Sequence, residues 1–174
     1  MSISETFSSP PLRKRLVWSA LAEIDFRLAV QEDAHAIALL FEQFFNEAGY
    51  KDRGIVYSVP KSEAWLENVI ARGVVPHLVA IKHRKIIGAI SYSLDDTFCV
   101  EPVAVLNMAY VVSEERKSAI GRVLVALVSD LARQDGACAF HAPLASGMAE
   151  QKTLINLFKH EGFDEIGAIL GKRL

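Results

Sequence analysis

Three β-rich segments follow one another between His77 and Val112 with only short polar connections. They cover residues 77–82, 86–94 and 103–112, and residues 83–85 and a turn at Asp95 and Asp96 join them. A parallel pair of strands needs a crossover of roughly a dozen residues or more, so connections this short predict an antiparallel meander. The meander limits the chain to folds built on a largely antiparallel sheet.

Helical patterns lie on both sides of the meander. Before it, alternation of apolar and polar residues predicts a strand, and two 3.6-residue periodicities predict helices on either side of a loop at residues 51–60. The second of these helices should face inward through Ala64, Trp65 and Val69, with Leu66 as a further candidate. The strand is expected at residues 24–28 and the helices at 31–49 and 61–72.

After the meander, an unbroken apolar stripe over residues 118–135 predicts the strongest helix of the chain. A short strand at 137–141, a helix over about 149–161 and a final strand to about residue 170 complete the pattern. This order predicts an α/β protein of the α+β type, with a central mixed, largely antiparallel sheet and helices on both faces.

Composition narrows the domain organisation and the partners. A length of 174 residues with 51% hydrophobic residues suits a single domain, expected at residues 23–174, after a basic N-terminal arm at residues 1–22. A net charge of −2 argues against nucleic acid as a partner. No apolar run reaches the roughly 18 residues of a membrane span, and neither cysteine has metal-ligand spacing. We therefore expect a cytoplasmic protein without a membrane or metal partner.

The junction between the third meander strand and the strong helix carries the chemistry. Small residues at Ser118, Ala119 and Gly121 let a ligand approach the backbone, and the unpaired N–H groups of a first helical turn favour an anion. Positive charge flanks this turn at Arg116, Lys117 and Arg122. The pattern predicts a phosphate or pyrophosphate seat, and its alternative is a tight helix start that binds nothing. Glycine patterns of dinucleotide sites and phosphate-binding loops are absent.

The same junction resembles a known family. Arg116-x-x-Ala119-x-Gly121, after a strand that ends in Ala109-Tyr110-Val111, resembles the acyl-CoA pyrophosphate motif Arg/Gln-x-x-Gly-x-Gly/Ala of the GNAT superfamily of N-acetyltransferases. Downstream, the segment from Leu157 to Phe163 is similar to the second signature of the family, which ends the last long helix with Gly-Phe. The resemblance covers about residues 24–174.

The resemblance implies acetyl-CoA as co-substrate, bound where two strands splay apart. Ala109 and Val111 would pair with the pantetheine arm, and Gln151 and Phe158 would contact the cofactor. Asn107, four residues before Val111, would lie close to the acetyl group. The pyrophosphate would bind the backbone N–H groups of Arg116, Lys117, Ser118, Ala119, Ile120, Gly121 and Arg122, with Ala119 in place of the first glycine.

The implied reaction is direct attack of a primary amine, on a small molecule or a peptide, on the acetyl thioester. Phe158 replaces the usual acidic tyrosine, so water, Ser113, Ser146 or no specific group would protonate the thiolate. Candidate bases are Glu101 and His141, and His141 can equally be a packed structural histidine. Turn residues Asp95 and Asp96 are further candidates.

The acceptor pocket and the competing functions stay open at this stage. In such a fold Glu47, Tyr50, Lys51 and Tyr57 would shape the acceptor pocket, or form ordinary loop surface. The alternatives to an enzyme are a degenerate GNAT-fold module that binds acyl-CoA or a partner without turnover, and a structural domain tethered by the basic arm. A homodimer is expected only by analogy with the fold.

Overall fold

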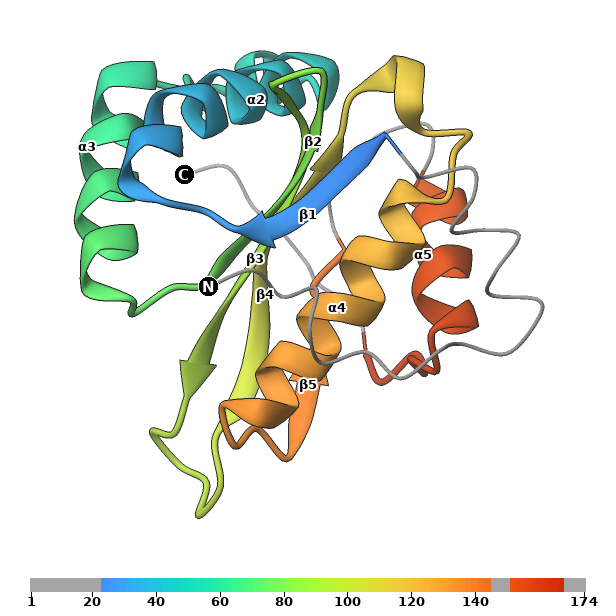
Figure 1. Cartoon of the computed structure of the whole chain (residues 1–174). Helices are drawn as coiled ribbons and strands as arrows, with labels where there is room; N and C mark the ends of the chain where they lie inside the picture. Colours follow the sequence, from blue (N-terminus) through green and yellow to red (C-terminus); the bar gives the residue numbers. More distant parts are fainter. Residues whose placement is uncertain (1–22, 145–150, 168–174) are drawn as a thin grey trace.

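The computed structural model describes residues 23–144 and 151–167 (Figure 1). It contains a five-stranded sheet in the order β1-β2-β3-β4-β5. The first three pairings are antiparallel and the last, between β4 and β5, is parallel. This confirms the predicted largely antiparallel mixed sheet. The strands are β1 (Ile24–Leu28), β2 (His77–Lys82), β3 (Lys85–Asp95), β4 (Val103–Val111) and β5 (Ala139–His141).

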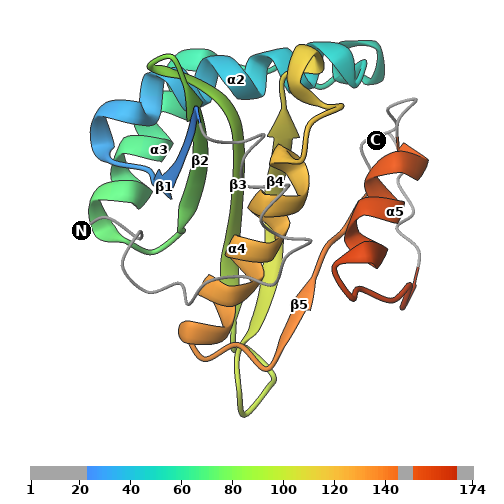
Figure 2. The same cartoon turned by 45° about the vertical axis from the view of Figure 1, so that its right-hand side comes forward.

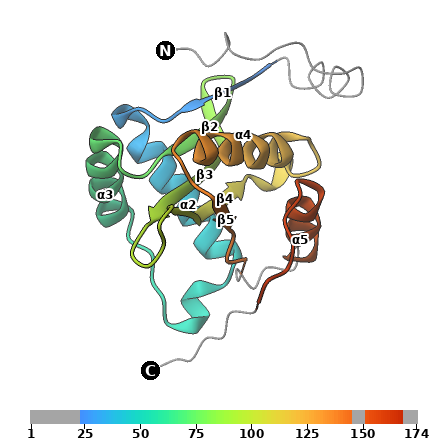
Figure 3. The same ribbon diagram turned by 90° about the horizontal axis from the view of Figure 1, so that it is seen from below.

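Helices cover both faces of the sheet. Helices α2 and α3 lie on one face and α4 on the other, while α5 lies beside α4 at the side of the molecule opposite α3 (Figures 1 and 3). Each face has its own buried core, one built around Ile37, Leu66 and Val79 and the other around Tyr92 and Leu124. The helices are α2 (Ala34–Glu47), α3 (Val59–Arg72), α4 (Ile120–Gln134) and α5 (Gln151–His160).

The connection between α2 and α3 is more ordered than the predicted loop at 51–60. A 3-10 turn at Tyr50–Arg53 lies between Gly49 and Gly54, whose positive φ angles of 64° and 80° suit glycine. Helix α3 begins at Val59, with Pro60 in its first turn, where the missing N–H of proline costs no hydrogen bond.

The inward face predicted for α3 is partly wrong. Leu66 and Val69 are buried, whereas Ala64 and Trp65 are exposed. The helix packs through the stripe that contains Leu66, so Trp65 lies beside this contact and is 48% exposed. The centres of the Trp65 and His77 rings are 5.9 Å apart. A tryptophan is large enough to cover a neighbour from such a position without entering the core.

Several predictions from the sequence concern the ends of the chain. The expected arm at 1–22 and Ser146 lie outside the described residues. No strand is formed at residues 163–167, and the rest of the expected final strand, 168–170, also lies outside them. Within the described part of the chain, no helix has the length and apolar character needed to cross a membrane.

His77 is a buried histidine that lies under Trp65 at the start of β2. It is 2% exposed, its Nδ1–H donates to the Val75 carbonyl at 2.8 Å, and its Nε2 has no partner among the described residues. Burial lowers the pKa of His77, so the folded protein holds the imidazole neutral. As the pH falls below about 6.5, the unfolded chain binds a proton that the folded chain resists, and stability is lost.

We therefore expect His77→Asn, which keeps a donor toward Val75, to flatten the fall in unfolding free energy between pH 7 and pH 5. Urea titrations at several pH values measure this slope. His83→Asn, at an exposed residue with a φ of 49° that asparagine tolerates, should keep the slope of the unsubstituted protein. Equal slopes for His77→Asn and the unsubstituted protein would show that His77 is not the source of the pH dependence.

Candidate active site

Strands β4 and β5 run together only briefly and then separate. Their last paired residues are Val105 and His141, after which β4 continues to Val111 and β5 ends (Figure 2). Asn107 lies at an irregularity of β4, because Met108 pairs with Ser91 of β3 and Leu106 with the next residue, Tyr92. An extra residue of this kind bends a strand, and here it does so where β4 leaves β5.

Beyond the bend, β4 presents an open edge. The Val112 N–H donates to the Ile87 carbonyl of β3 at 2.9 Å. Because successive residues of a strand direct their backbone groups to opposite edges, the N–H and C=O groups of Val111 and Ala109 point away from β3. Among the described residues, Arg116 contacts this edge, because its Nε donates to the Val111 carbonyl at 3.0 Å.

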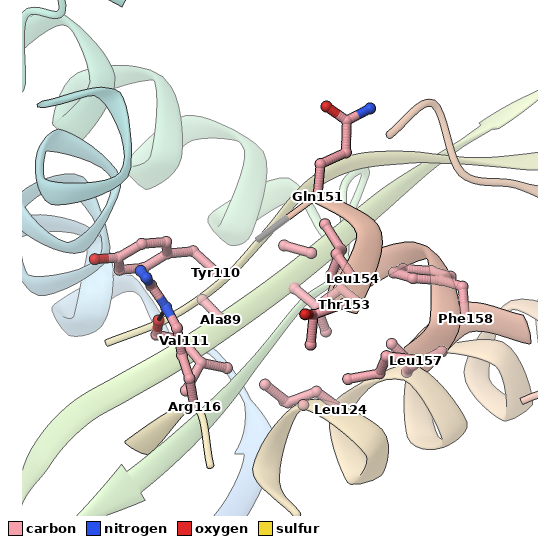
Figure 4. Close-up of a pocket in the computed structure, with 14 residues that line it drawn as sticks. Ala89, Tyr110, Val111, Arg116, Leu124, Gln151, Thr153, Leu154, Leu157 and Phe158 are labelled. Carbon is pink, nitrogen blue, oxygen red and sulfur yellow. Dashed lines mark hydrogen bonds between the residues drawn. The ribbon is translucent and has the colours of Figure 1, made fainter. Parts of the chain in front are cut away.

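A cavity of about 150 Å³ lies between this open edge, the start of α4 and the inner side of α5 (Figure 4). Its walls are mostly apolar, and Leu124 of α4 and Leu157 of α5 face each other across it. Gly121 allows the two helices to approach, since a Cβ at this residue would lie 3.0 Å from the Leu157 Cδ1. Its polar lining residues are Tyr110, Arg116, Gln151 and Thr153.

The turn before α4 carries backbone donors without acceptors. Ser118 Oγ donates to the Glu115 carbonyl at 2.6 Å and accepts the Ile120 N–H at 3.3 Å, which fixes the start of the helix. The N–H groups of Lys117, Ala119, Gly121 and Arg122 have no hydrogen-bond acceptor among the described residues. Together with the helix dipole, these groups fit an anion.

The basic side chains of this turn are partly neutralised, which the sequence did not predict. Arg116 forms an ion pair with Glu47, and Arg122 Nε lies 2.9 Å from the Glu161 Oε1. Lys117 is exposed. The local positive charge predicted from the sequence is therefore balanced by two carboxylates that lie far away along the chain.

Glu47, the last residue of α2, links the end of this helix to the turn before α4. Its Oε1 accepts the Tyr110 hydroxyl at 2.7 Å, and its Oε2 pairs with the Arg116 guanidinium, which lies 5.2 Å from the centre of the Tyr110 ring. Burial and the hydrogen bond to Glu47 raise the pKa of Tyr110, so the phenol is a protonated donor at neutral pH.

The three predicted catalytic residues are not brought together at this cavity. Asn107 lies at the bend of β4, where its Oδ1 accepts the Ser93 hydroxyl at 3.1 Å. His141 ends β5 and lines a second cavity, of about 640 Å³, between β5 and α5, which shares Gln151 and Phe158 with the first. Glu101 is exposed and precedes β4 at the end of the strand away from the first cavity. Asp95 accepts the Thr97 N–H at 3.0 Å in the β3–β4 turn, and this bond lowers the pKa of Asp95.

The two predicted cofactor contacts on α5 both line the cavity. Gln151 Nε2 donates to the Leu144 carbonyl at 3.0 Å, which ties the first residue of α5 to the segment after β5. Phe158 is 2% exposed, and its ring packs 5.0 Å from the ring of Phe163. Where the described residues are concerned, no group of three or more His, Cys, Asp or Glu side chains is placed to hold a metal ion.

Comparison with known families identifies this architecture. A model described as the acetyltransferase (GNAT) family matches residues 34–163, well over half of the chain. The chain belongs to the GNAT acetyltransferase family. The resemblance seen in the sequence is therefore confirmed. The comparison with curated proteins found no match.

Solved GNAT structures share the fold at low sequence identity. The aminoglycoside N-acetyltransferase AAC(6')-Iy in complex with CoA is 15% identical, with a TM-score of 0.69 over 87% of this chain and 94% of its own. A ribosomal-protein-alanine N-acetyltransferase from Brucella melitensis biovar Abortus 2308 is 15% identical, with a TM-score of 0.66 over 87% and 99%. A predicted acetyltransferase from Clostridium acetobutylicum, with acetyl-CoA, is also 15% identical, with a TM-score of 0.66 over 86% and 95%.

The hydrogen bond between Tyr110 and Glu47 should stabilise this GNAT domain measurably. We expect Tyr110→Phe to lower the free energy of unfolding by about 1–3 kcal/mol, because it removes a donor to a partly buried carboxylate. Tyr50→Phe is the matched control, since the Tyr50 hydroxyl has no hydrogen bond among the described residues. Denaturant unfolding measures both, and equal stabilities of the two variants would contradict the expectation.

Proposed function

We propose that the protein is an N-acetyltransferase that transfers an acetyl group from acetyl-CoA to a primary amine of a small molecule or peptide. The observation that carries this proposal is the open edge of β4 after Val105, beside an apolar cavity and a turn with unpaired N–H groups. Each part of acetyl-CoA would find a matching feature there. The pantetheine arm would lie along the strand edge, the thioester against the apolar wall, and the pyrophosphate on the N–H donors.

The roles of the cofactor-binding residues follow from this arrangement. In the segment from Arg116 to Arg122, the free N–H groups of Lys117, Ala119, Gly121 and Arg122 would hold the pyrophosphate. The N–H groups of Arg116, Ser118 and Ile120 already have acceptors within the turn. Ala109 and Val111 would pair with the pantetheine arm, and Gln151 and Phe158 would close the α5 side. Among the solved neighbours, AAC(6')-Iy with CoA and the Clostridium acetobutylicum protein with acetyl-CoA support the choice of cofactor.

The chemistry would be direct attack of the neutral amine on the thioester carbonyl. An N–H on the open edge of β4 would hold the developing oxyanion, and the thiolate would leave with help from water or Ser113, since Phe158 has no proton to give. Asn107, at the bend, would orient the amine. His141 would accept the proton through water, and Glu101 would need a longer water chain because it lies at the far end of β4.

The acceptor, the compartment and the partners are also proposed. A small amine acceptor is supported by the fold's similarity to AAC(6')-Iy, an aminoglycoside N-acetyltransferase. Its structure in complex with the bisubstrate analogue CoA-S-monomethyl-acetylneamine also matches this fold. Cys99 and Cys138 are free and exposed, which supports a reducing, cytoplasmic compartment. The net charge of −2 supports a partner other than nucleic acid or membrane, and a homodimer is proposed from the fold alone.

A second candidate function is a GNAT-fold module that binds acyl-CoA without turnover. Two observations favour it. Phe158 is buried and apolar where a proton donor would be needed, and neither His141 nor Glu101 lines the first cavity. Binding and turnover must therefore be measured separately.

Acetyl-CoA at 1 mM should raise the melting temperature by about 5 °C or more, through binding to the folded state alone. Thiol release is then followed with a panel of primary amines. Turnover that depends on an amine supports the transferase, and a thermal shift without turnover supports the binding module. Absence of any shift would contradict both candidates.

Gly121 offers a test of the cavity itself. Gly121→Ala places a methyl group against Leu157 and should raise the dissociation constant of CoA several-fold, while the helix propensity of alanine maintains stability. Leu157→Ala in the same chain removes the clash and should restore part of the affinity. Isothermal titration calorimetry measures both, and unchanged CoA affinity in Gly121→Ala would place the cofactor elsewhere.

A further inference from the structure

Glu47 lies where the two ligands of a transferase would meet. It ends α2, on the acceptor side of the sheet, and both of its partners, Tyr110 and Arg116, line the cavity. Figure 4 shows these two side chains together, with the Tyr110 ring directed away from Leu157 and Phe158 of α5. The carboxylate is therefore one contact away from the proposed thioester site.

The surroundings of Glu47 are suited to a cation. The ring of Phe44 lies 5.8 Å from the rings of both Tyr110 and Tyr50, and two guanidinium groups already lie over this aromatic surface. Arg116 is 5.2 Å from the centre of the Tyr110 ring, and Arg53 is 5.3 Å from that of Tyr50. A carboxylate beside aromatic faces binds ammonium and guanidinium groups.

With the cofactor bound as proposed, Arg116 would have two competing anions within its reach. Its backbone belongs to the turn that would hold the pyrophosphate, and its side chain pairs with Glu47. A pyrophosphate carries more negative charge than one carboxylate and offers the same two-pronged geometry to a guanidinium. The side chains of Arg116 and Glu47 remain 25% and 34% exposed, so exchange of partners has a modest cost.

We infer that the Glu47 carboxylate is the binding site for the ammonium group of the acceptor, and that Arg116 occupies it until the cofactor pyrophosphate draws the guanidinium away. This inference rests on the proposed function. It identifies the acceptor as a cationic primary amine on an aromatic or apolar body, which Phe44 and Tyr50 would contact. It also couples the two ligands, because the cofactor would free the carboxylate that the acceptor binds.

The first test uses CoA binding to the full-length protein. Glu47→Gln keeps an acceptor for the Tyr110 hydroxyl and removes the charge that competes for Arg116, so CoA should bind about threefold to tenfold more tightly. Glu63→Gln is the control, because it removes a carboxylate whose exposed ion pair with His35 is remote from the cavity. A role of Glu47 in packing alone would weaken CoA binding, and unchanged or weaker binding in Glu47→Gln overturns the inference.

The second test measures coupling between CoA and a cation. Phenethylamine is the probe, and 2-phenylethanol is its uncharged counterpart. With CoA present, the affinity for phenethylamine should rise by at least about fivefold in the unsubstituted protein and not in Glu47→Gln, and 2-phenylethanol should show no coupling. Coupling that is absent in the unsubstituted protein, or that persists in Glu47→Gln, overturns the inference. Failure of CoA to bind the unsubstituted protein would instead overturn the proposed function, and the inference with it.

Discussion

The separation of β4 from β5 after the Val105–His141 pair is the feature on which the rest of the site depends. A sheet closed along its whole length would leave the backbone groups of Ala109 and Val111 paired with a neighbouring strand. The irregularity at Asn107 bends β4, and β5 is only three residues long, so the edge beyond stays open. Helix α5 then forms the far wall of a cavity beside this edge.

Close approaches elsewhere keep this cavity small and apolar. Gly121 allows α4 and α5 to pack closely. Gly88 allows α4 to pack closely on β3, since a Cβ at Gly88 would lie 3.2 Å from both Leu124 and Val111. Tyr92 and Phe158 fill the core beneath. On the other face Tyr110 packs with the α2 core and donates its hydroxyl to Glu47, so α2 is tied to the strand that would hold the cofactor. The same contacts thus stabilise the fold and fix α2 relative to the open edge of β4.

Much of this architecture could be predicted from the sequence, because it depends on local periodicity. Short connections predicted the meander, and the apolar stripe after residue 118 predicted α4. The small residues at Ser118, Ala119 and Gly121 predicted an anion seat at a turn where the structure has N–H groups without acceptors among the described residues. The resemblance to the GNAT family rested on two short motifs, each at the end of a single strand or helix, so it too depended on local sequence. The inward face of α3 was misjudged at Trp65, because periodicity alone does not fix which neighbouring stripe meets the sheet.

Contacts between segments that are distant along the chain could not be predicted from the sequence. Strands β2, β3 and β4 lie between Glu47 and Arg116 in the sequence, and nothing local in either segment predicts that the two residues pair. The same limit applies to catalysis: Glu101 and His141 were chosen by their position before and at the end of strands. Pairing register and strand length place them away from the first cavity.

A crystal structure of the protein with CoA would show whether the open edge of β4 and the start of α4 bind the cofactor. We expect the pantetheine arm along Ala109 and Val111, and the pyrophosphate on the N–H groups between Lys117 and Arg122. CoA bound at another surface, with the edge of β4 empty, would overturn the proposed site.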